Sequence, residues 1–309
     1  MSSAMKTLAF GEVLWDIIEG REYIGGAPFN LASHLAHMGC HAAMVSAVGK
    51  DERGDRALTA VKEKGVIDKY IAAHNDLPTG IVEVQLDSAG KPTYVIREGS
   101  AWDSIELSDT QMQAIESEKW DIVAFGSLAQ RTAGNRKALA EVLAAASPEE
   151  VFCDVNLRLE YYSKEIISQS LEHATILKLN DEEVPIISNL LYGKEILDRE
   201  FCEKMAEDWD IHTTAITRGK DGASVYRDDR YVHVPVIDVT VVDTVGAGDS
   251  FSAAFLFGLF YTEEIEKAAN LASLVSSFVA SKSGAIPAYD EPVKKAIERV
   301  HREATESLE

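Results

Sequence analysis

Apolar runs alternate with amphipathic stretches along almost the whole chain. The runs that indicate strands are Leu8–Ile18, Ala43–Val48, Ile122–Gly126, Val151–Val155, Thr175–Leu179 and Thr213–Thr217. The stretches between them that indicate helices include Pro28–Met38, Ala133–Ala146, Lys164–His173 and Lys194–Trp209. Continuous apolar strands separated by helices are typical of a parallel sheet covered on both faces. The pattern therefore predicts a doubly wound α/β fold with a mainly parallel sheet.

Two segments break this alternation. Residues 81–97 alternate apolar and polar side chains on either side of a turn at Ser88–Pro92, which predicts a β-hairpin with one wet face. Ile17–Ile24 contains a polar turn and is expected to pair with it. We interpret the resulting small antiparallel sheet as a lid, inserted at about 17–25 and 78–103 into one core of residues 1–309; a surface hairpin without function is the alternative. A second hairpin is predicted at Ala223–Val236.

Charge and cysteine content exclude several classes of protein. The formal net charge of −21 argues against a nucleic-acid or anionic-membrane partner, since either would require a basic face. The three cysteines lie far apart and form no CxxC pair, which suits a reducing cytosol. The N-terminus shows no secretory signal, and the apolar stretches near Phe251–Tyr261 and Leu271–Ala280 are too short to span a bilayer. We therefore expect a cytoplasmic protein.

The clearest chemical signal is the loop Asp243–Asp249, which opens onto the apolar helix Phe251–Tyr261. Gly246 and Gly248 flank Ala247 and let the backbone approach a ligand, and the free N–H groups of the helix start form an anion site. A carboxylate at Asp249 would repel a bound phosphate. It is expected, however, if it accepts the proton of a hydroxyl that attacks a phosphoryl group. The alternative is that Asp249 is only an N-cap.

Other nucleotide motifs are absent from the sequence. No Gly-Lys is followed by Ser or Thr, no G-x-G-x-x-G follows a strand, and there is no H-R-D catalytic loop. A phosphate site in this chain must therefore be built differently.

Two motifs carry a resemblance to a known family. Asp243–Asp249 resembles the C-terminal motif of the ribokinase-like (PfkB) carbohydrate kinases, and Gly25–Asn30 (Gly-Gly-Ala-Pro-Phe-Asn) resembles their N-terminal motif. The similarity extends from Leu8 to about Pro287, with the motifs in the family's order. It implies a sugar kinase that uses ATP and Mg²⁺.

The resemblance assigns residues to the sugar. Asp16, at the end of the first strand, is implied to bind sugar hydroxyls; Gly26 lets the sugar approach the backbone, and Asn30 binds substrate. Asp and Asn together offer the acceptors and donors that neighbouring hydroxyls need. The alternative for Asn30 is an amide on the helix surface. Leu14 stands where ribokinases proper usually carry Asn, which disfavours ribose.

The resemblance also assigns residues to the nucleotide and its metal ion. Asn180 and Glu183 match the family's N-x-x-E motif, which acts through water on Mg²⁺ and the phosphates. Thr217, Gly219 and Gly222 match a T-x-G-x-x-G stretch beside the phosphates and ribose. The alternatives are a capped helix start for the first motif and a glycine-rich turn for the second.

Two segments near the C-terminus match the adenine pocket of the family, namely Asn270–Ser273 and Ser281–Pro287. The resemblance assigns Asn270 to the nucleotide, and assigns Asp243 and the Val245 carbonyl to a monovalent cation such as K⁺. Lys282-Ser283 departs from the Arg-Pro that is common there in the family.

Several segments favour bacterial fructokinases within the family, namely Gly11–Asp16, Gly26–Asn30, Arg97–Asp103 and Asp154–Arg158. The implied reaction is in-line transfer of the ATP γ-phosphoryl group to O6 of D-fructose. Arg97 and Arg158 are candidate substrate ligands; because an Arg fork suits carboxylate or phosphate, 2-keto-3-deoxygluconate or a phosphosugar stays open. Structural ion pairs are the alternative for both. A ribose or nucleoside kinase and a non-catalytic sugar- or nucleotide-binding regulator are the other hypotheses.

Two further expectations concern surfaces. In the family that the chain resembles, lid strands with an apolar face often pair between subunits, so the resemblance implies a homodimer. His34, His37 and His41 have a spacing that could indicate a metal site, but no acidic ligand lies nearby in the sequence. We therefore expect His34 and His37 to lie on the surface of a helix.

Overall fold

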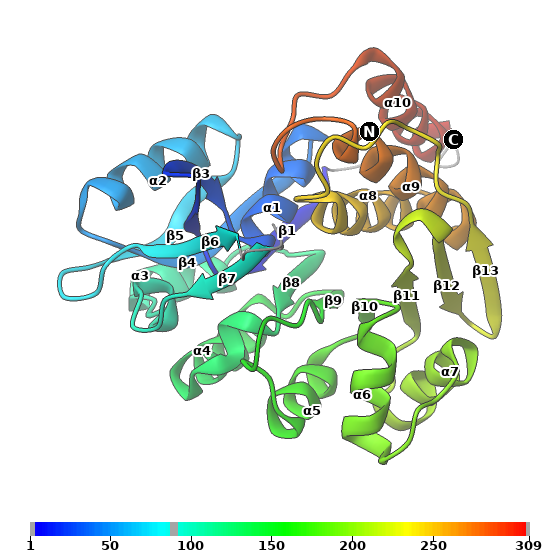
Figure 1. Cartoon of the computed structure of the whole chain (residues 1–309), viewed down its shortest axis with the longest axis horizontal. Coiled ribbons are helices and arrows are strands. Elements are labelled where there is room, and N and C mark those ends of the chain that lie inside the picture. Colours follow the sequence, from blue (N-terminus) through cyan, green and yellow to red (C-terminus); the bar gives the residue numbers. More distant parts are fainter. Residues whose placement is uncertain (1–3, 87–91, 307–309) are drawn as a thin grey trace.

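A nine-stranded sheet forms the centre of the protein (Figure 1), as seen in a computed structural model that describes residues 4–86 and 92–306. Its order is β13-β12-β11-β10-β9-β8-β1-β4-β5, parallel from β11 to β5, with β12 and β13 antiparallel. The strands are β1 Lys6–Phe10, β4 His41–Gly49, β5 Ile67–His74, β8 Ile122–Gly126, β9 Glu150–Asp154, β10 Ile176–Asn180, β11 Thr213–Thr217, β12 Ala223–Arg227 and β13 Arg230–Val234.

Helices cover both faces of this sheet. One face carries α1 Ala27–His37, α2 Glu52–Glu63, α8 Ala247–Thr262, α9 Ile265–Ala280 and α10 Glu291–Glu306 (Figure 1). The other carries α3 Asp109–Glu116, α4 Ala133–Ala146, α5 Lys164–His173, α6 Glu183–Tyr192 and α7 Asp198–Trp209. Within β1, Ala9 packs into the first core while Leu8 and Phe10 pack into the second. The predicted doubly wound fold is confirmed.

A second, smaller sheet lies beside the first, with strand order β3-β2-β6-β7 (Figure 1). Its strands are β2 Leu14–Ile18, β3 Arg21–Gly25, β6 Gly80–Leu86 and β7 Pro92–Ile96. The sequence predicted it as antiparallel, but β2 and β6 run parallel, and the chain passes through α1, β4, α2 and β5 between β3 and β6. Most of the turn predicted at Ser88–Pro92 lies outside the described residues.

The expectation of one continuous strand over Leu8–Ile18 was wrong. The chain leaves the main sheet after Phe10 and enters the small sheet at Leu14. The break occurs at Gly11, whose φ is +147° and where a Cβ would lie 2.6 Å from Pro28 Cγ. Because apolar residues continue through the break, periodicity could not locate it.

Two features of the fold bear on where a ligand binds. The chain places β4 and β5 on one side of β1, and β8 and the strands after it on the other. Doubly wound sheets bind ligands outside the carboxyl ends of the strands at such a switch point. Short 3₁₀ turns adjoin these ends at Ala101–Asp103, Leu128–Arg131 and Gly219–Asp221.

Within the described residues, no helix is long and apolar enough to cross a membrane.

Candidate active site

Asp249 lies in the first turn of α8 and contacts the first turn of α1. Asn30 Nδ2 donates to Asp249 Oδ2 at 2.7 Å, although 219 residues separate them. Asn30 is buried, so the surface-amide alternative does not describe it. Burial raises the pKa of Asp249 to about 6; the charge of Asp154 raises it too, while the Asn30 bond, Lys178 and Arg158 oppose the rise. Asp249 is therefore ionised at neutral pH yet basic enough to accept a proton.

The loop before Asp249 begins the helix. Gly246 is the N-cap of α8, with φ of +77° and ψ of −3°. A Cβ at Gly246 would lie 2.6 Å from Ala285 Cα, so the residue must be glycine. Ala247, Gly248 and Asp249 form the first turn. Ala247 N donates to the Thr244 carbonyl at 3.2 Å, and the N–H groups of Gly248 and Asp249 have no partner within the helix and can bind an anion.

Two more carboxyl groups lie near Asp249. Burial raises the pKa of Glu12 to about 7 and that of Asp16 to about 6, and the charges of Asp249 and Arg158 act on both. Asp16 extends from β2 over β3, where a Cβ on Gly25 would lie 2.3 Å from its Oδ2. Asp16, Arg158 and Asp249 therefore share one electrostatic environment.

Gly26 is required by the packing of α1. Its φ is +115°, and a Cβ there would lie 2.3 Å from the Glu12 carbonyl oxygen. Glu12 Oε1 accepts a bond from Ala27 N at 3.2 Å, at the start of the helix. Gly26 and Glu12 together fix the helix that carries Asn30.

Lys178 is a part of this site that sequence reasoning missed. It is buried in β10, where its Nζ donates to both oxygens of Asp154 at 3.0 and 3.1 Å, and Ser252 of α8 donates to the same carboxylate at 3.0 Å. A Cβ on Gly248 would lie 3.4 Å from Lys178 Nζ. Burial alone would lower the pKa of Lys178, but the charges of Asp154 and Glu183 outweigh it and raise that pKa. Lys178 therefore keeps its positive charge, and its ammonium group lies beside the Gly246–Asp249 loop.

Asn180 and Glu183 hold the backbone around them. The two carboxylate oxygens of Glu183 accept bonds from Leu157 N at 2.6 Å and Asn180 N at 2.8 Å. Asn180 Oδ1 accepts from the N–H groups of Glu182 and Glu183, both at 2.9 Å. Burial raises the pKa of Glu183. In this structure the N-x-x-E motif caps the start of α6 and ties it to the loop after β9.

A largely apolar cavity of about 430 Å³ adjoins the Gly246–Asp249 loop. Its lining includes Thr217, Gly219, Gly222, Val236, Ile237, Val241, Ala247, Gly248, Phe251, Ser273, Ser276 and Ser277. The three residues predicted from the T-x-G-x-x-G stretch therefore meet there. Asn270 is not among the residues that line it, and its Nδ2 donates to the Glu266 carbonyl on the exposed side of α9.

Asp243 links two loops. Its Oδ1 accepts from Val245 N at 3.0 Å, and its Oδ2 accepts from Gly284 N at 3.1 Å. Each carboxylate oxygen keeps a further lone pair. This donor set suits an oxygen-coordinated cation beside the Val245 carbonyl.

The two candidate arginines have different surroundings. Arg97 is exposed and pairs with Glu83 of the small sheet at 2.6 Å. Arg158 Nη1 donates to the Leu157 carbonyl at 3.2 Å, and its charge lowers the pKa of Glu12, Asp16 and Asp249. Arg158 therefore belongs to the acidic site electrostatically, whereas Arg97 forms a surface ion pair.

Arg131, also missed in the sequence, joins the small sheet to the core. Its guanidinium pairs with Asp103 at 2.7 and 2.8 Å and stacks between the rings of Trp102 and Tyr161. It also donates to the Arg97 carbonyl, and Tyr161 Oη donates to the Ile96 carbonyl. The end of β7 is thus held by two side chains of the core.

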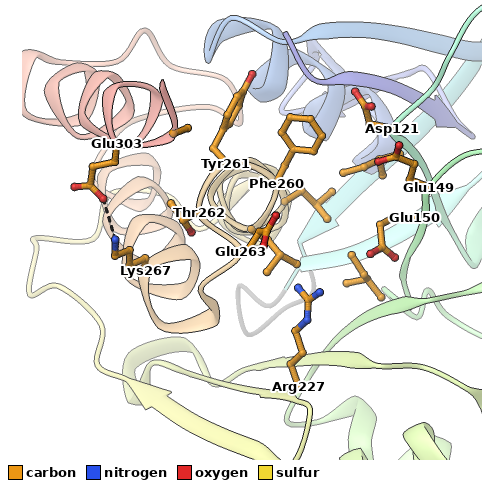
Figure 2. Close-up of a pocket in the computed structure, with 15 residues that line it drawn as sticks. Asp121, Glu149, Glu150, Arg227, Phe260, Tyr261, Thr262, Glu263, Lys267 and Glu303 are labelled. Atoms are coloured by element: carbon orange, nitrogen blue, oxygen red, sulfur yellow. Dashed lines mark hydrogen bonds and ion pairs between the residues drawn. The ribbon is translucent and has the colours of Figure 1, made fainter. Parts of the chain in front are cut away.

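A larger cavity of about 660 Å³ lies at the opposite edge of the sheet (Figure 2). It adjoins the first residues of β8, β9 and β10 and the last of α8. Its lining carries Asp121, Glu149, Glu150, Glu263 and Glu303, with Arg227 and Lys267 as cations, and Lys267 bonds Glu303 at 3.0 Å. A wall so acidic disfavours a nucleotide, so size alone does not identify the active site.

The histidine expectation was half wrong. His34 is fully buried, while His37 is exposed. Among residues 4–86 and 92–306, no group of three or more His, Cys, Asp or Glu side chains is arranged to hold a metal ion.

A doubly wound sheet with an anion-binding helix start, a half-buried carboxylate and an adjoining apolar cavity defines a phosphotransferase of the ribokinase fold. The profile of the pfkB family carbohydrate kinases matches residues 4–292, and the chain belongs to this family.

Three relatives illustrate the similarity. The sugar kinase PH1459 of Pyrococcus horikoshii is 29% identical over 97% of this chain and 96% of its own length. Its structure in complex with ATP has a TM-score of 0.81 and covers 95% of this chain and 99% of that one, at 27% identity. The fructokinase of Escherichia coli is 26% identical over 85% of this chain and 88% of its own. The 2-dehydro-3-deoxygluconokinase of Thermotoga maritima, at 21% identity and with 97% of this chain and 99% of that one covered, shares the fold with a TM-score of 0.81.

Proposed function

We propose that this sugar kinase transfers the γ-phosphoryl group of ATP to D-fructose and yields fructose 6-phosphate. The observation that carries the proposal is the contact of Asn30 with Asp249 at the start of α8. It places a group suited to sugar hydroxyls beside a carboxylate whose pKa of about 6 suits a general base, at a helix start that can hold a phosphoryl group.

Each group at the helix start has a role in the transfer. Asp249 accepts the proton of the attacking hydroxyl, a role generally worth about 10²–10⁴ in rate. The N–H groups of Gly246, Ala247 and Gly248 stabilise the charge that develops on the transferred group. Lys178 adds a fixed positive charge behind Gly248. Asp16 and Asn30 orient the sugar so that its hydroxyl faces Asp249.

The apolar cavity binds the nucleotide. Thr217, Gly219 and Gly222 contact the phosphates and ribose, and the adenine occupies the part lined by Val236, Ile237 and the three serines of α9. We place those serines, Ser273, Ser276 and Ser277, in the role that the sequence assigned to Asn270. The neighbouring first turn of α8 then faces the γ-phosphate.

Metal ions complete the site. Mg²⁺ supplies charge neutralisation and orientation of the phosphates. Mg²⁺ would be held mainly by phosphates and water, with Asn180 and Glu183 acting on it through water. Asp243 and the Val245 carbonyl would hold a monovalent cation such as K⁺.

Fructose is favoured over the other sugars by the similarity to fructokinases. Arg158 supports a second candidate, because a guanidinium in this acidic site could bind the carboxylate of 2-keto-3-deoxygluconate. A relative named ATP-dependent 6-phosphofructokinase, 27% identical, keeps phosphosugars among the candidates.

The small sheet acts as a lid that excludes water from the transfer. Tyr23 and Val95 expose apolar surface on its strands, 44% and 42% of each residue, which supports a homodimer formed through the lid. The net charge of −21 favours small-molecule partners in the cytoplasm over nucleic acid or membrane.

The test is ADP release measured over fructose, ribose, 2-keto-3-deoxygluconate, fructose 6-phosphate and nucleosides, with the product identified by NMR. We expect the highest kcat/KM with fructose and phosphate on O6. A preference for another sugar would overturn the substrate but keep the kinase. Binding of sugar or ATP by calorimetry without ADP release across the panel would identify a regulator instead.

A further inference from the structure

His34 connects α1 to the 281–287 loop, the segment between α9 and α10. Its Nε2 lies 2.9 Å from the Ala285 carbonyl oxygen, and its Nδ1 lies 2.6 Å from Tyr289 Oη. Because a carbonyl only accepts, Nε2 carries the proton, and Nδ1 then accepts from the tyrosine hydroxyl. Burial lowers the pKa of His34 to about 4, so this neutral form persists at neutral pH. Tyr289 stacks on the same ring.

The 281–287 loop lies directly behind the phosphate-binding turn. Ala285 is the residue that a Cβ on Gly246 would strike, and Gly284 N donates to Asp243 Oδ2. The first residue of the Asp243–Asp249 loop and its middle residue, Gly246, therefore depend on where Gly284 and Ala285 lie. Lys64 Nζ donates to the next carbonyl, that of Ile286, at 3.1 Å.

Asn30 and His34 are four residues apart and therefore lie on the same side of α1. Asn30 holds Asp249, and His34 holds the loop that supports Gly246. One helix thus contacts the base directly and the phosphate-binding turn indirectly. Nothing in the Asp249 mechanism uses His34 itself.

We propose that His34 is a positioning residue of the transfer reaction: through the Ala285 carbonyl it fixes the 281–287 loop, and thereby the Gly246 turn that stabilises the transferred phosphoryl group. The inference rests on the proposed function for its effect on rate, but the tether itself does not. A merely structural His34 would affect stability without affecting the turn.

Two amide variants separate these cases. His34→Gln places an N–H donor near the position of Nε2 and keeps the bond to Ala285. His34→Asn is shorter, reaches only the position of Nδ1, and loses that bond. We expect kcat to fall at least tenfold in His34→Asn and less than threefold in His34→Gln, with the sugar KM within threefold in both.

Ser33→Ala is the matched control, because Ser33 is buried on the same helix and its hydroxyl donates to the Phe29 carbonyl of that helix. We expect kcat within threefold of wild type. Hydrogen exchange gives a readout without activity: the Gly284 amide should exchange at least tenfold faster in His34→Asn than in wild type, His34→Gln or Ser33→Ala.

Equal losses in the two amide variants, equal retention in both, or a loss in Ser33→Ala matching His34→Asn would overturn the inference. If wild type phosphorylates no sugar, the proposed function fails, and exchange at Gly284 still decides the tether. Where His34→Asn does not fold, long-range ¹H–¹⁵N spectra of wild type decide. Neutral His34 protonated on Nε2 supports the tether, and protonation on Nδ1 contradicts it.

Discussion

Asp249 takes its chemical character from the charged groups around it. Burial and the carboxylate of Asp154 raise its pKa, while Asn30, Lys178 and Arg158 hold it within reach of neutral pH. Lys178 itself stays charged because Asp154 compensates for its burial. The result is a carboxylate that is ionised at pH 7 and more basic than an ordinary Asp, which is what a general base for a hydroxyl requires.

The pH dependence of kcat/KM should reflect this. The base must be deprotonated to act, so activity should fall below a pH of about 6, tenfold per pH unit for a single group. Asp16, whose pKa is also about 6, would steepen the decline if its charge is needed for the sugar. Initial rates at subsaturating sugar between about pH 4.5 and 8 provide the measurement. An acid limb near pH 4 would show that the groups around Asp249 do not shift its pKa.

The contribution of Asp249 to the free energy of unfolding depends on pH in the opposite sense to its contribution to activity. Its folded pKa is above the value of 3.8 for an ordinary Asp, so the folded protein holds the proton more tightly than the unfolded chain. The contribution of Asp249 to the free energy of unfolding is therefore fully present below about pH 4 and is lost as pH rises through about 6. At neutral pH the ionised carboxylate is a cost that the protein bears for function.

Helix α1 is the element on which the site depends most. Gly26 and the Glu12 carboxyl fix where it begins, and Asn30 and His34 carry its contacts to α8 and the 281–287 loop. A change at its N-cap, Gly26, should therefore affect the whole site. Gly134 of α4, by contrast, has no such constraint.

Gly26→Ala should lower the free energy of unfolding by about 3 kcal/mol and abolish most activity, because a side chain there is strained at φ +115° and meets the Glu12 carbonyl. Gly134→Ala is the matched control. Gly134 lies in α4 with an ordinary φ, and a Cβ added there would meet no neighbouring atom, so alanine should stabilise by up to about 1 kcal/mol. Urea denaturation measures both. Shifts of the same sign and size would contradict this account of α1.

The sequence pattern predicted those helices and strands whose formation depends on their own residues. Strands β8 and β11 and helices α4 and α5 have the predicted bounds, because their apolar periodicity follows from residues within each element. Strand β5 was missed, because Ile67–His74 is only partly buried and lacks a continuous apolar run. The break at Gly11 depends on Pro28, a contact that no local pattern records.

The residues of the candidate site also differ in whether a local sequence pattern indicates them. Asp249 and its glycines were predictable because a small-residue loop before an apolar helix is visible in the sequence. Lys178 had only a weak signal, a cation inside an apolar strand, and its partner Asp154 lies 24 residues away. No local pattern indicated the role of His34, because the carbonyl that its ring contacts is 251 residues further along the chain.

The whole molecule brings these pieces together at one edge of the sheet. The carboxyl ends of β1, β8, β9, β10 and β11 lie side by side there. The helices of one face supply Asn30 and Asp249 and line part of the apolar cavity in which we propose that the nucleotide binds. The opposite edge holds the acidic cavity of Figure 2, so phosphate groups are favoured at only one of the two. Membership of the carbohydrate kinase family fits this arrangement.

Sugar-dependent ADP release by Asp249→Asn, compared with wild type, tests the central claim most directly. Asparagine keeps an oxygen for the Asn30 bond and removes a buried charge, so the variant should fold with a Tm equal to or above that of wild type. We predict that its kcat falls by about 10²–10⁴ while ATP still binds. A folded variant that phosphorylates sugar at a rate near wild type would contradict the assignment of Asp249 as the base.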